Sequence, residues 1–209
     1  MVEIHPKTAT ARELGKTRNR KLLLHAAAKS IHQHGLRGTT VDVIQRYSGL
    51  GRGMINQHFK SKENLLWSVA EQLMSEYRQN WRTCLEKGGT TYEGKLRALC
   101  QGEFSETVLT QQTVSIWLAF RSEASASVSY QRLVADGDAE FNEALYNLCR
   151  AICEERQLSD VDPRRVSRLM NAVFEGLWLE FHLNPQSFDR QAASDACFHM
   201  AQKLMAVTS

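Results

Sequence analysis

The side chains best suited to binding chemistry lie between residues 52 and 62, where basic and amide groups alternate with apolar ones. Arginine presents paired donors that fit guanine, asparagine and glutamine fit adenine, and lysine neutralises phosphate. His58 has a second interpretation, because beside Phe59 it also fits a packed, hydrogen-bonded histidine. The candidate DNA contacts are Thr39, Thr40, Arg52, Gly53, Asn56, Gln57, His58, Lys60 and Lys62.

Two short helices are expected to position these side chains. Thr39 and Thr40 can cap a helix at about 41–48, and Gly49 suits the tight turn that follows it. A second helix at about 52–58 would turn its apolar residues inward and its polar residues outward. This layout is typical of a helix-turn-helix, although spacing alone fits an ordinary helical hairpin equally well.

The distribution of charge favours the DNA-binding interpretation. Residues 1–62 contain twelve Lys or Arg and three acids, a net charge of +9, whereas the remaining 147 residues carry −6. A solvated lysine-rich surface would not explain an acidic remainder. We therefore predict a basic arm and DNA-binding domain at 1–62, and a second domain at 63–209.

Composition excludes several other classes of protein. No apolar run reaches the roughly 18 residues of a membrane span, and the first residues lack the apolar stretch of a signal peptide. The five cysteines contain no CxxC pair, which suits reduced thiols in a cytoplasm. His32 with His34, and Cys149 with Cys153, are two-ligand pairs without a completing ligand. We predict no enzyme activity, no metal and no cofactor.

Apolar residues recur at spacings of three and four, which predicts an all-α protein. Residues 1–15 are polar and uncapped and are expected to form a loose arm. In and just after this arm, Arg12, Lys16 and Arg18 would follow the DNA backbone or reach the minor groove. A helix at 17–34 should stop at Gly35. After the two short helices, a long helix should run from its cap at Ser61 to Gly88–Gly89, and the rest are expected at 91–108, 111–124, 127–156, 163–183 and 188–207.

The helix at 163–183 is apolar on more than one face. Together with the last helix, it would form a four-helix interface in a homodimer. Such a dimer would read two half-sites about 34–36 Å apart. The alternative is a thicker monomeric core.

The first 66 residues resemble the TetR family of bacterial repressors. The resemblance rests on Gly38-Thr39-Thr40, Ile44, Ser48-Gly49-Leu50, Gly53, Ile55, His58 to Glu63 and Leu65-Leu66. It implies about nine helices, a divergent ligand domain, a homodimer and double-stranded operator DNA as partner. Three positions depart from the family pattern: Gln45 replaces a small residue, Gly51 a serine cap and Asn56 a tyrosine.

Residues 100–190 resemble the BetI branch of that family, which represses betaine synthesis and responds to choline. The resemblance rests on Phe104-Ser105-Glu106-Thr107, Trp117-Leu118-Ala119-Phe120, Glu175 to Leu179 and Phe188-Asp189-Arg190. Arg121 stands where relatives often carry tryptophan. Near a cationic ligand, this arginine should point away or be paired with Glu123.

A quaternary ammonium ligand is best held by aromatic faces and a carboxylate, at roughly 2 kcal/mol or more per desolvated ring contact. Phe104, Trp117, Phe120, Tyr130, Phe174 and Trp178 offer rings, while Glu103, Glu106 or Glu175 offer charge. The simpler alternative is that most of these rings belong to the core.

We predict a ligand-responsive repressor whose ligand tilts the helix at 61–87 and spreads the two recognition helices. Three alternatives stay open: a nucleoid protein that tolerates any DNA sequence, a helical enzyme, and a repressor that responds to a different effector. That effector would be another small apolar or cationic compound, such as a drug or an acyl compound.

Overall fold

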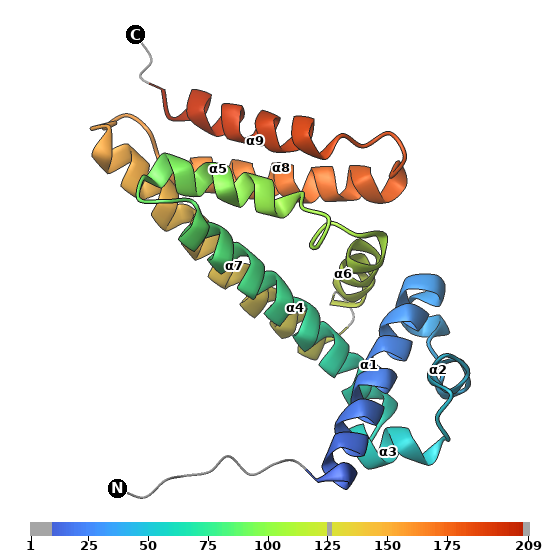
Figure 1. Cartoon of the computed structure of the whole chain (residues 1–209). Coiled ribbons are helices and arrows are strands. Elements are labelled where there is room, and N and C mark those ends of the chain that lie inside the picture. Colours follow the sequence, from blue (N-terminus) through green and yellow to red (C-terminus); the bar gives the residue numbers. More distant parts are fainter. Residues whose placement is uncertain (1–9, 125–126, 207–209) are drawn as a thin grey trace, which may run out of the picture. The chain divides into compact units, whose positions relative to one another are not determined.

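The structure is a computed structural model that describes residues 10–124 and 127–206. Those residues form nine α-helices and no strand, which confirms the all-α prediction (Figure 1). The helices are α1 (Ala11–Gly38), α2 (Val41–Ser48), α3 (Gly53–Phe59), α4 (Lys62–Lys87), α5 (Tyr92–Glu103), α6 (Gln111–Ala124), α7 (Val128–Glu155), α8 (Pro163–Leu183) and α9 (Arg190–Leu204). None of these helices is both long and apolar enough to cross a membrane.

The chain divides into two compact units, and α4 contributes to both. The first unit extends to Val69 and the second begins at Ala70. The predicted boundary after residue 62 lies at the start of α4, seven residues before this division.

Helix α1 begins at Ala11, six residues before its predicted start at residue 17. Thr10 accepts a hydrogen bond from the Glu13 amide, and the Glu13 carboxylate accepts one from the Thr10 amide at 2.7 Å, which together form a capping box. The expectation of an uncapped arm is therefore wrong for residues 11–15, whereas residues 1–9 lie outside the described part. Gly35 has φ +66° and kinks the helix, and helical geometry resumes up to Gly38.

The core of the first unit joins α1, α2 and α3. Its fully buried apolar residues include Leu23 and Ile31 of α1, Ile44 of α2 and Ile55 of α3. Thr40 caps α2 by accepting from the Val43 amide, and Gly49 ends it with φ +68°. The predicted helix and turn at 41–49 are confirmed.

The second unit consists of α5 to α9 and the part of α4 that begins at Ala70. Helix α7 packs against α5, α6 and α8, while α9 packs against α5 and α8 (Figure 1). In α4, Arg78 pairs with Glu140 of α7 at 2.7 Å, and the ring centroids of Tyr77 and Phe141 lie 5.4 Å apart.

Helix α5 is shorter than the predicted 91–108, because it ends at Glu103 and a turn region follows. Arg190, the first residue of α9, donates hydrogen bonds to the carbonyl oxygens of Phe104 at 2.9 Å and Leu109 at 2.8 Å. A non-helical segment needs partners for its carbonyl groups, and a residue 86 positions away supplies them. Local periodicity carries no sign of such a long-range contact.

Candidate functional site

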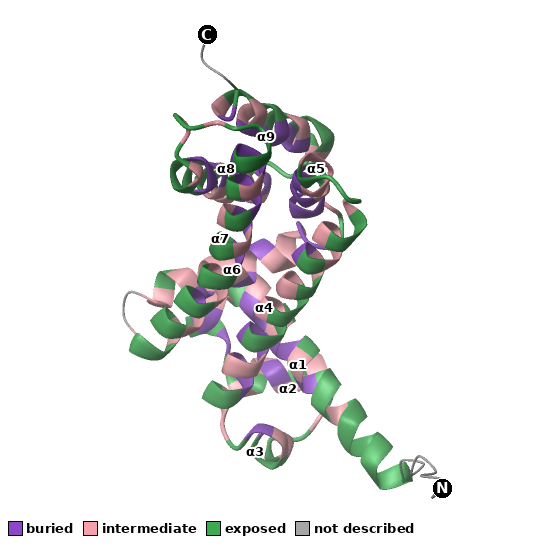
Figure 2. Cartoon of the chain, turned by 90° about the vertical axis from the view of Figure 1, so that its left-hand side faces the viewer, coloured by how far each residue is buried: buried purple, intermediate pink, exposed green. Residues whose placement is uncertain are grey.

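The outer side of α3 carries the polar side chains predicted to contact DNA. Gly53, Asn56, Gln57 and Lys60 are exposed, whereas Ile55 and Phe59 are buried (Figure 2). Two amide side chains in succession can each donate to and accept from a base edge. This side of α3 has the chemistry of a recognition surface.

Arg52 precedes α3 and reaches back to α2. Its guanidinium pairs with Asp42, and its Nε donates to Gln45 Oε1 at 3.3 Å. Gln45, which replaces the usual small residue, is therefore half-buried and accepts a hydrogen bond from Arg52. The ion pair is mostly exposed, and such pairs contribute about 0–1 kcal/mol, so Arg52 can exchange Asp42 for a base or a phosphate.

The N-terminus of α3 lacks the side-chain cap that is usual for such helices. Arg52 is its N-cap residue and makes no side-chain capping bond, while the Met54 amide donates to the Gly51 carbonyl oxygen at 3.0 Å. Gly51 thus closes the first turn through its backbone. The first amides of this helix keep donor capacity for other acceptors.

Thr39 and Lys62 connect the end of α1 with the start of α4. The Thr39 side chain is fully buried, where its hydroxyl accepts from Ser30 at 3.0 Å and donates to the Gly35 carbonyl oxygen at 2.8 Å. It holds the end of α1, which differs from the expected contact with DNA. Lys62 Nζ donates to the Thr39 carbonyl oxygen at 3.2 Å, and Ser61 caps α4 as predicted.

His58 is half-buried, and its Nε2 is shielded from solvent with no hydrogen-bond partner among the described residues. Burial lowers the pKa of His58, and the nearby charges of Lys16 and Arg20 lower it further. The ring is therefore neutral near pH 7. This geometry favours the packed interpretation of His58.

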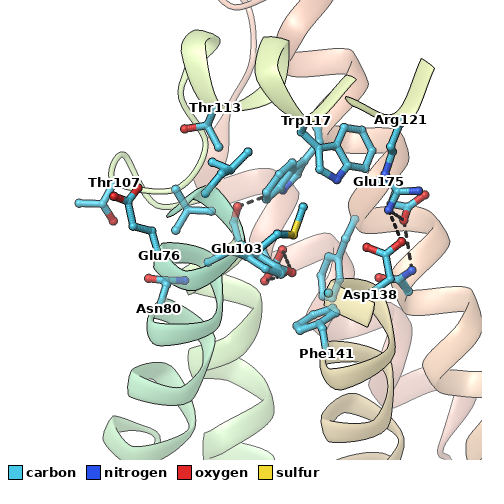
Figure 3. A pocket seen from close by; sticks show the side chains of 18 residues that line it. Glu76, Asn80, Glu103, Thr107, Thr113, Trp117, Arg121, Asp138, Phe141 and Glu175 are labelled. Atoms are coloured by element: carbon cyan, nitrogen blue, oxygen red, sulfur yellow. Dashed lines mark hydrogen bonds and ion pairs between the residues drawn. The ribbon is translucent and has the colours of Figure 1, made fainter. Parts of the chain in front are cut away.

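A cavity of about 310 Å³ lies within the second unit, at the lower end of the roughly 300–1,000 Å³ typical of ligand sites (Figure 3). Five helices contribute to it, from α4 to α8. Its walls include Leu73, Met74, Glu76, Tyr77, Asn80, Glu103, Thr107, Val108, Thr113, Trp117, Arg121, Gly137, Asp138, Phe141, Asn171, Phe174, Glu175 and Trp178.

Glu103 is the most deeply placed carboxyl group of this cavity, with 1% of its surface exposed. The Tyr77 hydroxyl donates to its two carboxylate oxygens, at 2.9 and 3.1 Å. Burial raises the pKa of Glu103 to about 8, although the Tyr77 hydrogen bond acts in the opposite direction. A cation beside this carboxyl would lower its pKa again.

Aromatic rings line the same cavity as Glu103. The Trp178 ring centroid lies 5.7 Å from those of both Tyr77 and Trp117, and its indole Nε1 donates to the Glu103 carbonyl oxygen at 3.2 Å. Phe141 and Phe174 complete the aromatic wall, 6.3 Å apart. Rings around a buried carboxyl group form the arrangement that holds an ammonium group without N–H donors.

Arg121 occupies the side of the cavity that α6, α7 and α8 enclose. It donates to Asp138 at 2.7 Å and to Glu175 at 3.0 Å, and its guanidinium carbon lies 4.3 Å from the Trp117 ring centroid. Burial raises the pKa of Asp138, and Arg121 opposes that shift. The expected alternatives for Arg121 were pointing away or pairing with Glu123, and the structure instead pairs it with these two carboxylates.

Two family models match the chain. The N-terminal model of the tetR family of bacterial regulatory proteins matches residues 23–69. The model of the C-terminal part of the BetI-type transcriptional repressor matches residues 93–206. The chain belongs to the TetR family. Its second unit is of the BetI type, and the protein is a transcriptional regulator.

Similar proteins agree with this placement. The HTH-type transcriptional regulator BetI of Pseudomonas aeruginosa is 28% identical over 195 residues, which cover 91% of this chain and 94% of that protein. BetI 2 of Chromohalobacter salexigens is 29% identical, with 83% of this chain and 82% of that protein covered. The crystal structure of a transcriptional regulator from Pseudomonas aeruginosa PAO1 has a TM-score of 0.82 at 24% identity, covering 90% and 91% of the two chains. It shares the fold.

The predicted ligand residues of this TetR protein divide into two groups. Trp117 of α6 and Phe174, Glu175 and Trp178 of α8 line the cavity, so two helices bring them together. The other four do not line it and are packed or exposed elsewhere. Phe104 is buried against Phe174 and Phe188, Phe120 packs against Tyr130 with ring centroids 5.2 Å apart, and Glu106 is exposed.

Sequence reasoning missed the residues that α4 and α7 contribute. Tyr77, Asp138 and Phe141 line the cavity but were not among the predicted ligand residues. Gly137 carried a usable signal, since a glycine inside a long helix often marks a close approach. A Cβ atom there would lie 2.7 Å from Met74 Sδ of α4, so the glycine lets α4 and α7 meet beside the cavity.

Cys149 and Cys153 are both buried in α7. Burial raises the pKa of Cys149 to about 12, and the neighbouring Cys153 contributes to the shift. A thiol with so high a pKa forms little thiolate near pH 7, and the thiolate is the reactive species. These groups are part of the core.

Proposed function

We propose that this TetR protein is a homodimeric repressor that binds operator DNA through its first unit. A small quaternary ammonium compound of the choline type, bound in the cavity of the second unit, releases it from the operator. The genes it controls would serve betaine synthesis or uptake. The buried Glu103, enclosed by aromatic rings, carries this proposal.

The chemistry of the cavity favours a cation over an apolar ligand. A quaternary ammonium has no hydrogen bond to offer, so it gains from ring faces and a negative charge in a place without water. An acyl chain would offer the buried carboxyl of Glu103 neither a positive charge nor a hydrogen-bond donor. The relatives named BetI support a ligand of the choline type.

An acyl ligand is the alternative. FadR of Bacillus subtilis, crystallised in complex with stearoyl-CoA, has a similar fold, with a TM-score of 0.74 at 17% identity over 87% of this chain and 96% of that one. Likeness at this level of identity concerns the fold alone. An acyl compound is therefore a necessary comparison ligand in any binding test.

The DNA-binding part of the proposal rests on the exposed side of α3 and on charge. Asn56 and Gln57 offer base contacts, and Lys60 offers a phosphate contact. The net charge of +9 over residues 1–62 supplies the attraction to the phosphate backbone. A nucleoid protein would share the charge but would not need exposed amide side chains on one short helix.

Helix α8 supports a homodimer. Leu169, Ala172, Gly176, Leu179 and Leu183 are exposed and follow one another at spacings of three and four, which puts them on one face of the helix. An added Cβ at Gly176 would meet nothing within 4 Å of this chain, so a partner helix could approach closely there. A second copy of the chain would cover this stripe and bring two recognition helices to the operator.

Helix α4 offers the coupling between ligand and DNA. It begins in the first unit and carries Tyr77, which donates to Glu103 in the cavity. A ligand that changes the charge of Glu103 changes a bond to this helix. The ligand can release DNA only through a difference in its affinity for the DNA-bound and free conformations.

Titration calorimetry with choline tests the proposal, with glycine betaine, betaine aldehyde and stearoyl-CoA as comparison ligands. Saturable binding of choline, near one per subunit, is expected, and choline should release a DNA fragment selected from random sequences by the protein itself. Replacing Trp178 with alanine should abolish the response to choline. Binding of stearoyl-CoA alone would establish the acyl alternative.

A further inference from the structure

Arg121 fills one side of the ligand cavity with a positive charge that belongs to the chain itself (Figure 3). Its guanidinium reaches Asp138 of α7 at 2.7 Å and Glu175 of α8 at 3.0 Å. The guanidinium carbon also lies 4.3 Å from the Trp117 ring centroid. About a quarter of the Arg121 side chain is exposed, so these contacts are partly shielded from water.

Two carboxylates and the face of an indole ring are the groups that would hold an ammonium ligand. Beside Trp117, the Arg121 guanidinium already contacts the indole ring and both carboxylates. Glu103 differs, because its carboxyl is held by the neutral hydroxyl of Tyr77. Figure 3 shows Glu103 apart from the Arg121 cluster, so the cavity has two places suited to a cation.

We propose that Arg121 sets the charge specificity of the cavity. By occupying the place at Trp117, Asp138 and Glu175, it admits ligands with one ammonium group and rejects ligands with two. The single ammonium group then binds between Glu103 and the rings of Tyr77 and Trp178. This inference rests on the proposed binding of ammonium compounds.

A second ammonium group meets two obstacles. It must either approach the guanidinium, where like charges repel in a partly desolvated site, or displace Arg121 from both carboxylates. Displacement would remove two hydrogen-bonded ion pairs and a ring contact of Arg121, and a quaternary ammonium group would regain only the charge and ring contacts. Neither route gains free energy from the second charge.

Calorimetry at pH 8 with two probes tests this specificity. The probes are tetramethylammonium and a short series of bis(trimethylammonium) alkanes of increasing spacer length. The natural chain should bind tetramethylammonium at least about tenfold more tightly than any bis-ammonium compound. Arg121→Met removes the charge and keeps an unbranched side chain, and should reduce that preference to less than about threefold or reverse it.

Two variants and a control sharpen the test. Arg121→Lys keeps a cation and should keep the preference for one charge. Arg121→Gln replaces the methionine variant if a thermal melt shows that the latter does not fold. Arg97→Met removes an arginine that also stacks on a ring, 3.9 Å from the Phe198 centroid, but lies outside the cavity lining, and should behave as the natural chain.

The outcomes separate this inference from the proposed function. Suppose that the natural chain binds tetramethylammonium, and that the Arg121→Met variant prefers it over the bis-ammonium compounds as strongly as the natural chain does. The inference is then wrong, while the proposed function stands. The inference would also be overturned if Arg97→Met reduced the preference for tetramethylammonium as much as Arg121→Met does. If neither the natural chain nor the Arg121 variants bind any ammonium probe, both fail together.

Discussion

Choline affinity should depend on pH through Glu103, and the direction and size of the effect follow from its burial. Burial raises the pKa of this carboxyl to about 8, so the free protein carries it mostly protonated at pH 7. A bound cation favours the carboxylate, so binding must release the proton. Affinity should therefore rise with pH until the carboxyl is ionised without ligand.

The size of the pH effect on choline affinity follows from the fraction of free protein in which Glu103 is ionised. With a pKa of about 8, that fraction is about 1% at pH 6 and about half at pH 8. If the ligand holds the pKa of the complex below 6, the dissociation constant falls about 50-fold over this range, or about 2.3 kcal/mol. Above pH 8, at most about a further twofold gain remains.

Calorimetry in buffers of different ionisation enthalpy measures the linked proton directly. About 0.9 protons should leave per choline bound at pH 7. The Glu103→Gln variant should bind more weakly at pH 8, release no proton and show a nearly flat profile from pH 6 to 8. Glu106→Gln is the matched control, because Glu106 is exposed outside the cavity lining. Its replacement should change neither the choline affinity nor the number of protons released. A natural chain whose choline affinity is constant across this range would refute the assigned role of Glu103.

Four further predictions test other parts of the structure. The raised pKa of Glu103 means that ionising it destabilises the free fold, so the melting temperature of the natural chain should fall relative to Glu103→Gln as pH rises from 5 to 8.5. Gly102→Ala should destabilise by about 1–3 kcal/mol in denaturant unfolding, since the new Cβ would lie 2.3 Å from Cys84 Sγ. Gln57→Ala should weaken binding to selected DNA by about 1–3 kcal/mol in fluorescence titrations and leave binding to random DNA unchanged. Leu179→Glu should convert a dimer to monomers in light scattering, because it puts a charge in the exposed stripe of α8.

Helix positions were largely predictable because they depend on local signals. Asp162 and Pro163 start α8, and Asn184 ends it, at the predicted residues. The start of α1 was missed because its capping box, Thr10 with Glu13, was overlooked in a polar segment. The sequence contained that signal, so this error was one of interpretation.

The cavity was only partly predictable, because its members meet through packing across five helices. Trp117 and Trp178 could be named from residue type and family likeness. Phe104 and Phe120 have the same chemistry but face the core, and residue type does not distinguish these two environments. The pairing of Arg121 with Asp138 depends on the register of α6 against α7, which periodicity leaves open.

The two carboxyl environments of the cavity show how a ligand without hydrogen-bond donors can act on α4. Asp138 and Glu175 already have a countercharge in Arg121, whereas among the described residues the Glu103 carboxyl has the Tyr77 hydroxyl as its hydrogen-bond donor. A quaternary ammonium cannot replace that hydroxyl, since it has no N–H to donate, but it stabilises the ionised form of Glu103. A hydrogen bond to an ionised acceptor is roughly twice as strong as one to a neutral acceptor. The ligand therefore strengthens the bond between Tyr77 of α4 and Glu103 of α5, while a primary amine would compete for the same oxygens.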